Sequence, residues 1–417
     1  MVPLRSVDDH LTACLSAIRR LAAAEIPLLD SLGCVLAQDV TAAIDMPRFD
    51  NSSMDGYAVV AADLSGASPQ EPVQLPVVGD VPAGNPATEA LHPGSVVRIM
   101  TGAPLPPGAD AVVPVEWTDS GTSQVRIDRA PAPGQFVRRI GEDVRCGMQV
   151  LAAGTRLAPR HLSLLATIGQ GAVLAYPRPR VLVLPSGSEL IPPGQRLTAG
   201  AIHDSNGYGI TAAARRAGAD AEHGGIVDDQ PNLVAAALDE AARRADLVVT
   251  TGGVSMGAYD TIKEVLGGRG TVDFYPVAMQ PGMPQGFGVL GPDRTPIFTL
   301  PGNPVSALVS FELFVAPALR KLSGALTSTG DLELSAVHRL VPAVAGASWR
   351  SPRGKRQFTR AVRTSDQGGF VVRPVGSQRS HLVADLAGAN CLAIVPEDVT
   401  AVEPGDRLDC LLLDEDG

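Results

Sequence analysis

Closely spaced cysteines are missing from this sequence. Its 417 residues include five cysteines, and no two of them form a C-x-x-C pair. Disulfide frameworks and zinc sites both depend on ligands at short, regular spacings. We therefore expect reduced, mostly buried thiols, as in a cytosolic protein, and no zinc site. The scattered cysteines are Cys14, Cys34, Cys146, Cys391 and Cys410.

Long apolar runs are also absent. No stretch approaches the about 20 consecutive apolar residues that a transmembrane helix needs. The first residues lack the apolar core of a secretory signal peptide. Instead, Ser6 and Asp9 resemble a helix capping box, and Leu11, Leu15 and Ile18 follow at helical spacing. We expect a cytoplasmic protein without a membrane anchor, beginning with an amphipathic helix.

An excess of positive charge is the third absence. The chain has 34 Lys and Arg against 44 Asp and Glu, a formal net charge of −10. Surfaces that bind nucleic acid neutralise phosphates with Lys and Arg, so nucleic acid is excluded as a general partner. The net negative charge of the protein repels anions, so a small anionic substrate would need a locally positive binding site.

Turn-forming residues are abundant. The chain has 44 Gly and 35 Pro without a short period, while hydrophobic residues make up 45% and charged residues 19%. This composition excludes collagen-like and disordered chains and allows sizeable cores. The length favours two to four domains.

The amino-acid composition and the hydrophobic pattern change between regions of the chain. From residue 46 to 139 it is rich in Pro, Gly and Val, which predicts a small β-rich module with strands near 73–78, 95–100 and 111–115. After residue 323 short strand patterns return, which is typical of a small barrel or sandwich. These later strands are expected at 335–341, 357–362, 369–375, 391–395 and 407–412.

Between residues 180 and 322, apolar runs alternate with helical patterns. The run 181–184 is wholly apolar, as in a strand buried on both faces. The alternation predicts a parallel sheet covered by helices on both faces. Strands are expected at 181–184, 221–227, 247–250 and 296–300, and helices at 205–217, 231–245 (capped by Asp229), 260–266 and 305–322.

Unusual loops follow four of these strands, at 185–189, 228–229, 251–260 and 301–304. Ligands of open α/β sheets bind beyond the carboxyl ends of the strands, so the loops should meet at one rim. Gly252 and Gly253 would let backbone N–H groups approach an anion. Asn303 is a plausible helix N-cap with Pro304 behind it. The composition suits a phosphorylated ligand.

Three carboxylates should reach the same rim: Glu189, Asp228 and Asp260. Carboxylates beside a phosphate site repel it unless a cation lies between them, so Mg²⁺ is the simplest inference. Each loop alone is more typical of a tight turn with a helix cap. Four such loops together favour a functional site.

Other polar stretches stand outside the α/β region. The loop 47–59 and the turn 97–104 are each as consistent with ordinary turns as with a site. Arg138 and Arg139 offer paired guanidiniums for an oxyanion, although a salt-bridged surface turn fits equally well. A basic run, with Arg360 near its centre, is more typical of a solvent-exposed strand face. Its members are Arg353, Lys355, Arg356, Arg360 and Arg363.

Five segments closely resemble the MoeA/gephyrin E-domain family of molybdopterin molybdotransferases, in the family's order and spacing. They span nearly the whole chain, and the set is highly specific. The segments are Phe49–Ala58 (FDNSSMDGYA), Arg98–Pro104 (RIMTGAP), Arg139–Asp143 (RIGED), Gly252–Ser255 (GGVS) and Leu300–Ala307 (LPGNPVSA).

The resemblance implies an elongated four-domain protomer that works as a homodimer, with the β-rich module of one subunit facing the α/β domain of the other. The α/β domain would be three-layered, with a mostly parallel sheet similar to MogA, and the last domain a small β-barrel. The implied boundaries are 1–45 with 140–178 for a discontinuous linking and dimerisation domain, 46–139 for the β-rich module, 179–326 for the α/β domain and 327–417 for the barrel.

The resemblance also implies the reaction: Mg²⁺-assisted cleavage of adenylylated molybdopterin, which releases AMP while molybdate is captured by the dithiolene. The molybdopterin adenylyltransferase is a further partner that it suggests. By motif, Asp55 and Thr101 would be catalytic, as would Glu189, Asp228 and Asp260, which would also hold the metal. Substrate would be bound by Arg138, Ser186, Gly252, Gly253, Ser255, Pro301, Gly302 and Asn303.

The chain departs from the family in one place. Gln280 and Met283 stand where the family often has lysines, and Pro276 aligns with another. Lost ammonium groups weaken the binding of an anion unless arginines compensate. Two other functions remain open from the residues: a pterin adenylyltransferase, because the α/β domain resembles that family too, and a non-catalytic scaffold on the same fold.

Overall fold

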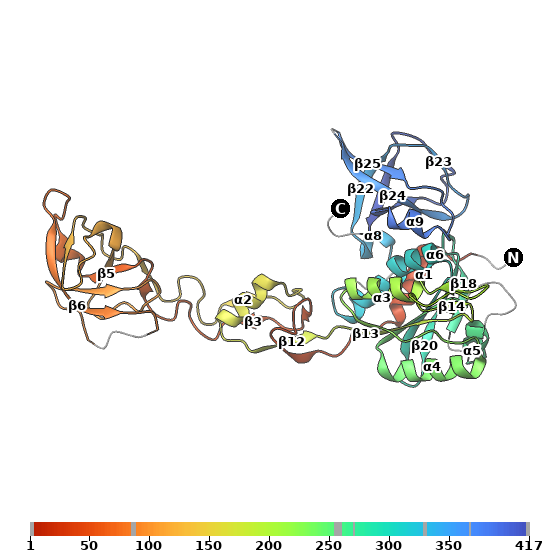
Figure 1. Ribbon diagram of the computed structural model, residues 1–417, viewed down its shortest axis with the longest axis horizontal. Helices are drawn as coiled ribbons and strands as arrows, with labels where there is room; N and C mark the ends of the chain where they lie inside the picture. Colours follow the sequence, from red (N-terminus) through yellow and green to blue (C-terminus); the bar gives the residue numbers. More distant parts are fainter. Residues whose placement is uncertain are drawn as a thin grey trace. The chain divides into compact units, whose positions relative to one another are not determined.

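The computed structural model describes residues 4–84, 89–253, 261–269, 272–327, 332–366 and 368–413 (Figure 1). Internal contacts divide the chain into two units, which are described separately. Unit 1 comprises Met1–Ala24, Gly33–Ala37 and Leu174–Gly417, and unit 2 comprises Glu25–Leu32 and Gln38–Val173. Within the described residues, no helix combines the length and apolar character needed to cross a bilayer.

The centre of unit 1 is a six-stranded sheet in the order β16-β13-β17-β21-β20-β18. Its first four strands are parallel, and a hairpin of two antiparallel strands extends one edge. The expected mostly parallel sheet is therefore confirmed. The bounds are β13 (Arg180–Pro185), β16 (Asp220–His223), β17 (Leu247–Thr251), β18 (Val272–Pro276), β20 (Pro284–Leu290) and β21 (Thr295–Leu300).

Helices cover both faces of this sheet, because successive strand residues point to opposite sides. Val181 and Val183 join a core with Ile210 of α3, whereas Leu182 and Leu184 join a core with Leu238 of α4. The three-layer arrangement is confirmed. Its helices are α3 (Asn206–Arg216), α4 (Pro231–Arg244), α5 (Thr261–Arg269), α6 (Pro304–Ser310) and α7 (Ala316–Leu322), with a π-helical turn at Phe311–Val315 joining the last two.

The N-terminal helix α1 (Val7–Ala17) packs in the same core. Its N-cap is Ser6, whose Oγ accepts a hydrogen bond from the Asp9 amide at 3.0 Å, as expected. Contacts place residues 1–24 in unit 1, whereas the resemblance assigns residues 1–45 to the linking domain. The division into four domains stays a prediction.

A closed barrel ends the chain. Its strands form the ring β24-β25-β22-β28-β26, which β24 and β26 close by pairing. Of barrel and sandwich, the barrel is confirmed. A two-stranded arm, β23 (Trp349–Arg350) and β27 (Ala401–Val402), and helix α9 (Val383–Ala387) accompany it. The ring strands are β22 (Leu340–Ala345), β24 (Arg356–Asp366), β25 (Gly369–Pro374), β26 (Cys391–Val395) and β28 (Arg407–Leu412).

Two expectations for this region were wrong. The stretch 335–341 begins as a short helix, α8 (Leu334–Val337), because Leu334 and Val337 are both buried at helical spacing. The basic run is not a solvated strand face: Arg360 is 1% exposed and donates to the carbonyls of Ser377 and Arg379. Arg356 is likewise tied to neighbouring acidic residues, Asp8 and Glu397.

Unit 2 contains a five-stranded sheet in the order β8-β5-β7-β6-β9, with apolar clusters on its two faces. The expected β-rich module is present. Its strands are β5 (Gly56–Val59), β6 (Val73–Val81), β7 (Val96–Ile99), β8 (Ala111–Pro114) and β9 (Gln124–Ile127), with 3-10 turns at Ala61–Leu64 and Val115–Trp117.

Short strand pairs flank this sheet along the chain. They are β4 (Asn51–Ser52) with β10 (Val137–Arg138), and β3 (Val40–Thr41) with β11 (Gln149–Leu151). The remaining elements of this part of the chain are helix α2 (Pro159–Thr167) and a three-stranded sheet of β1 (Ala24–Pro27), β12 (Ala172–Tyr176) and β2 (Val35–Leu36).

Candidate functional site

Loops at the carboxyl ends of the parallel strands contact one another. Ser186 forms a parallel bridge with Val227, and its amide donates to Thr251 O at 3.0 Å. The Gly252 amide donates to Leu300 O at 3.1 Å. The loops after β13, β16, β17 and β21 therefore meet at one rim, as the order of the strands requires.

Asp229 joins the first two loops. Its Oδ1 accepts from Ser186 Oγ at 2.9 Å, and its Oδ2 accepts from the Ser188 amide at 2.9 Å. We expected Asp229 to cap helix α4, but Gln230 is the N-cap residue and no side-chain cap forms. The expectation was wrong because this carboxylate is occupied by the neighbouring loop. The hydroxyl of Ser186, a predicted substrate ligand, is bonded within the protein.

Two glycines allow the loops to touch. Gly252 has φ +88°, and a Cβ built on it would lie 2.7 Å from Ser186 O. A Cβ on Gly302 would lie 3.6 Å from Gly252 Cα. Any larger side chain at Gly252 would push the two loops apart. Gly253, the other predicted anion ligand, continues the loop with φ +74°.

The loop after β21 is held from helix α3. Asn206 Nδ2 donates to Gly302 O at 2.7 Å. Pro301 is buried, whereas Asn303 is exposed and is the N-cap residue of α6, without a side-chain cap bond. The predicted pocket residues Pro301, Gly302 and Asn303 therefore lie at the rim beside Gly252.

Two of the three predicted metal ligands lie in the described rim. Glu189 folds over Gly187, where an added Cβ would lie 2.6 Å from Glu189 Oε2. Asp228 directly follows Val227, which forms the parallel β-bridge with Ser186. Both carboxylates are exposed. Asp260, the third ligand, and Ser255 lie outside the described residues.

This donor set fits Mg²⁺. Magnesium keeps several waters and commonly binds one or two carboxylates together with substrate phosphate oxygens. The two loops that carry Glu189 and Asp228 are joined by the hydrogen bond from the Ser188 amide to Asp229. Over the residues that the structure describes, no complete group of three acidic, His or Cys side chains forms a metal site. The three-carboxylate set stays a prediction.

A buried Asp–His pair lies beside the rim. Asp204 is 1% exposed and accepts from the Gly207 amide and from His223 Nε2, both at 2.8 Å. The Gly225 amide donates to His223 Nδ1 at 3.1 Å, so Nδ1 carries no proton and Nε2–H must donate to Asp204. The pair ties the segment that leads to Asp228 to the start of α3.

Sequence reasoning missed this pair because Asp204 and His223 are 19 positions apart. It also missed contributions of the barrel to the rim. Ser380 O accepts from the Val305 amide at 3.2 Å, at the start of α6. Lys355 Nζ lies 3.6 Å from Met283 Sδ, next to β19 (Met279–Gln280), which pairs with β24 of the barrel.

In unit 2 the structure brings two predicted catalytic residues together. Asp55 Oδ1 accepts from the Thr101 amide at 2.7 Å, and both residues are exposed. This backbone hydrogen bond lowers the pKa of Asp55 below its ordinary value, and a hydrogen bond from the Thr101 hydroxyl lowers it further. Asp55 is therefore a carboxylate throughout the neutral range.

Arg138 lies apart from that pair, on β10, where it pairs with Asn51 of β4. Its side chain is exposed. The next residue, Arg139, donates to Asp50 Oδ2 at 2.6 Å, and the Ile140 amide donates to Asp50 Oδ1 at 2.8 Å. The amide of Ile140 first, and then Arg139, lower the pKa of Asp50. Of the two arginines, Arg139 forms the salt-bridged turn and Arg138 keeps the exposed guanidinium.

Known proteins match this chain over nearly its whole length. Three family descriptions match in succession: "MoeA N-terminal region (domain I and II)" at residues 5–169, "Probable molybdopterin binding domain" at 183–321 and "MoeA C-terminal region (domain IV)" at 342–413. The molybdopterin molybdenumtransferase 2 of Mycobacterium tuberculosis is 46% identical over 97% of this chain and 98% of its own length.

Further relatives agree. The molybdopterin molybdenumtransferase of Haemophilus influenzae is 37% identical over 91% of each chain. Among solved structures, the molybdopterin biosynthesis MoeA protein from Pyrococcus horikosii is similar with a TM-score of 0.76 and 30% identity, covering 99% of this chain and 100% of that one. Neither an adenylyltransferase nor a scaffold is favoured by these relatives. The chain belongs to the molybdopterin molybdenumtransferase (MoeA) family.

Proposed function

We propose that this protein inserts molybdate into adenylylated molybdopterin and releases AMP in a Mg²⁺-dependent reaction. Its family places it among the transferases of molybdenum cofactor biosynthesis. The observation that carries the proposal is the rim of unit 1, where two exposed carboxylates lie on loops that join the glycine loop after β17. A phosphoanhydride needs both kinds of group: amides for its oxygens and carboxylates for a cation.

Each rim element has a separate task. The Gly252 amide already donates to Leu300 O, so the backbone amide of Gly253 binds the phosphate oxygens. Gly302 with its neighbours Pro301 and Asn303 shapes the pocket for the pterin. Glu189 and Asp228, with Asp260, would hold Mg²⁺. When bound, Mg²⁺ supplies charge neutralisation for the anhydride oxygens. Ser186 acts by holding Asp229, so its contribution is to position the two loops.

Function is tested by incubating the purified protein with adenylylated molybdopterin, Mg²⁺ and molybdate, and measuring AMP and cofactor together. Equal amounts of both are expected. Release of AMP without cofactor would exclude molybdate insertion. Net synthesis of adenylylated molybdopterin from ATP and molybdopterin would instead establish an adenylyltransferase.

We further propose that the protein is a homodimer in which Asp55, Thr101 and Arg138 of one subunit serve the rim of the other. This assignment rests on the family resemblance and on the exposure of Asp55 and Thr101. The molybdopterin adenylyltransferase, which would supply the adenylylated substrate, is a proposed transient partner. A cytoplasmic location is also proposed, supported by five cysteines that are all thiols rather than disulfides.

Mixed dimers test the shared site. Asp55→Ala and Asp228→Ala are each expected to be inactive, because each removes one carboxylate from every site. Refolding the two variants together should restore activity to about a quarter of the wild-type value, since half of the dimers are mixed and each has one intact site. If the mixture stays inactive, the two residues serve a site within one chain.

The side chain of Lys355 replaces, in our proposal, the lysines that the family often has at positions 280 and 283. Its contact with Met283 brings an ammonium to that segment. Lys355→Met should raise the molybdate concentration needed for half-maximal rate about tenfold, the effect of one charge-assisted hydrogen bond. Met283→Lys in that background should restore it.

The matched control for this prediction is Arg353→Met, which removes the same charge from an exposed neighbour. It should leave the molybdate dependence unchanged. An equal change in both variants would mean that only the overall positive charge of this region affects molybdate binding. No change in Lys355→Met would show that Lys355 does not contribute to the site.

A further inference from the structure

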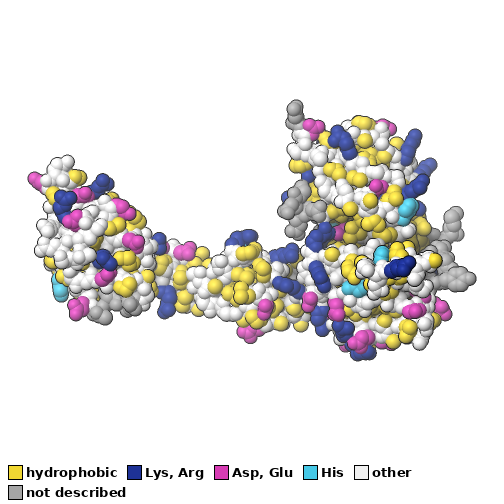
Figure 2. Space-filling view, in the orientation of Figure 1, with side chains coloured by type: hydrophobic (Ala, Val, Ile, Leu, Met, Phe, Trp, Pro, Cys, Tyr) yellow, Lys and Arg dark blue, Asp and Glu magenta, His cyan; other side chains and the backbone are white. Residues whose placement is uncertain are grey.

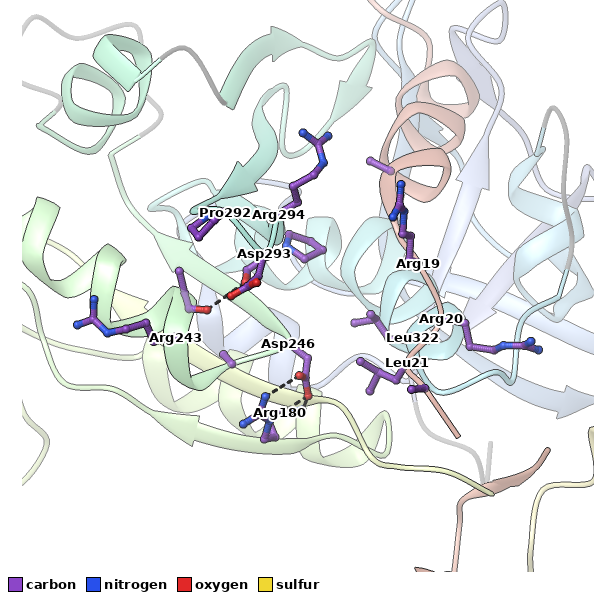
Figure 3. A pocket seen from close by; sticks show the side chains of 16 residues that line it. Arg19, Arg20, Leu21, Arg180, Arg243, Asp246, Pro292, Asp293, Arg294 and Leu322 are labelled. Carbon is purple, nitrogen blue, oxygen red and sulfur yellow. Dashed lines mark hydrogen bonds and ion pairs between the residues drawn. The ribbon is translucent and has the colours of Figure 1, made fainter. Parts of the chain in front are cut away.

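Unit 1 has a cavity at the end of the sheet opposite the rim. Arg180 begins β13, Asp246 precedes β17 and Thr295 begins β21, and all three line it. The segment after α1 and the turn between β20 and β21 form its sides (Figure 3). Its volume is about 520 Å³, within the range of small-molecule sites.

Arginines dominate the lining. The lining contains five arginines and two aspartates, in a protein whose net charge is −10. The Arg180 guanidinium is neutralised by Asp246, with contacts of 2.8 and 3.2 Å, and Arg243 contacts Glu240. The aspartates are Asp246 and Asp293, and the arginines are Arg19, Arg20, Arg180, Arg243 and Arg294.

Three of these arginines have no acidic partner among the residues that the structure describes. Arg20 lies over the ring of Tyr176, with its Cζ 4.3 Å from the ring centroid. Arg19 and Arg294 are exposed and come from different sides of the cavity, the segment after α1 and the β20–β21 turn (Figure 3). Two guanidiniums on facing elements can bind one phosphate with paired hydrogen bonds.

The cavity also has a fixed apolar wall. The Leu21 amide donates to Leu322 O at 2.9 Å, which holds the segment after α1 against the end of α7. Thr295 Oγ1 donates to Ala242 O at 3.1 Å and fixes the other side. Pro292 and Pro296 continue the apolar surface. A ring can pack on such a wall while its phosphate reaches the arginines.

We propose that this cavity binds a phosphorylated small molecule of nucleotide size. Its phosphate is held by Arg19 and Arg294, and its ring packs against Leu21, Leu322 and the prolines. The carboxylate of Asp293 limits the charge that the site accepts, which favours a monophosphate. The site is separate from the rim, so this proposal does not depend on the proposed reaction.

This site is tested by titration calorimetry on the full chain in the presence of EDTA. The two ligands are AMP and inorganic pyrophosphate, which has phosphates but no ring. AMP should bind more tightly than pyrophosphate. The double variant Arg19→Gln/Arg294→Gln should weaken AMP binding at least about tenfold, one charge-assisted contact or more. Both side chains are exposed, so the variant should keep its circular dichroism spectrum and melting temperature.

Two controls separate the cavity from other causes. Arg156→Gln/Arg160→Gln removes the same charge from exposed positions of unit 2 and should leave AMP affinity unchanged. Glu189→Gln/Asp228→Asn alters the rim and should also leave it unchanged. The proposal is overturned if AMP does not bind, if pyrophosphate binds equally well, or if either control weakens binding as much as the cavity variant.

Discussion

Replacing Asp228 by asparagine, or Glu189 by glutamine, should reduce the rate of AMP release and cofactor formation on the order of 10²- to 10³-fold, the usual effect of removing one group that stabilises developing charge. Each substitution keeps the size of the side chain and removes one negative charge. Both side chains are exposed, so the free energy of unfolding should change little. Rates are measured with adenylylated molybdopterin at saturating molybdate.

The dependence on Mg²⁺ distinguishes a metal ligand from a general charge effect. Both variants should need a higher Mg²⁺ concentration for half-maximal rate than the wild type. Asp220→Asn is the matched control, because Asp220 is exposed at the opposite end of the same strand β16. A variant with a low rate but an unchanged Mg²⁺ dependence would falsify the metal role of that carboxylate.

Gly56→Ala should destabilise unit 2 by on the order of 3 kcal/mol, the upper range for inserting one methyl group into a packed interior. Gly56 begins β5, which lies between β7 and β8. A Cβ there would lie 1.9 Å from Val113 O, a backbone atom that only a shift of β8 can move. Because Asp55 precedes Gly56, the contact between Asp55 and Thr101 should also be disturbed and activity reduced.

Tryptophan fluorescence can follow this unit alone. The chain has two tryptophans, and Trp117 belongs to unit 2 whereas Trp349 belongs to unit 1. A Trp349→Phe background therefore reports unfolding of unit 2 in urea. Gly79→Ala is the control in the same sheet, since its Cβ would make an ordinary contact of 3.7 Å with Val97. Equal unfolding midpoints for the two glycine variants would contradict the packing argument.

Much of the α/β domain could be predicted because its signals are local. The apolar run at 181–184 reads as a doubly buried strand, and the structure buries each of its residues. The glycine pair after the third strand predicted a close approach of the backbone to an anion; the structure shows in addition that Gly252 and Gly302 let two loops approach each other. Parallel strands place their carboxyl ends at one edge, so local patterns were sufficient to predict the rim.

Other features depend on contacts between distant segments. Asp229 has the position and chemistry of a helix cap, yet the loop after β13 offers it two donors and takes both carboxylate oxygens. Arg360 belongs to a basic run, yet β24 lies in the closed barrel and buries it. In both cases a segment distant in sequence supplies the partners: two donors for the carboxylate of Asp229 and two carbonyl acceptors for the guanidinium of Arg360.

By itself, the sequence determined the alternation of strands and helices, the β-rich segments on either side and the glycine and acidic loops at the strand ends. Hydrophobic period and turn chemistry are properties of neighbouring residues, so they can be read along the chain. Only the tertiary structure decided which side chains lie next to the rim loops: His223 with Asp204, and Lys355 beside Met283. These pairs come from separate elements, and the packing of those elements, rather than their spacing along the chain, brings them together.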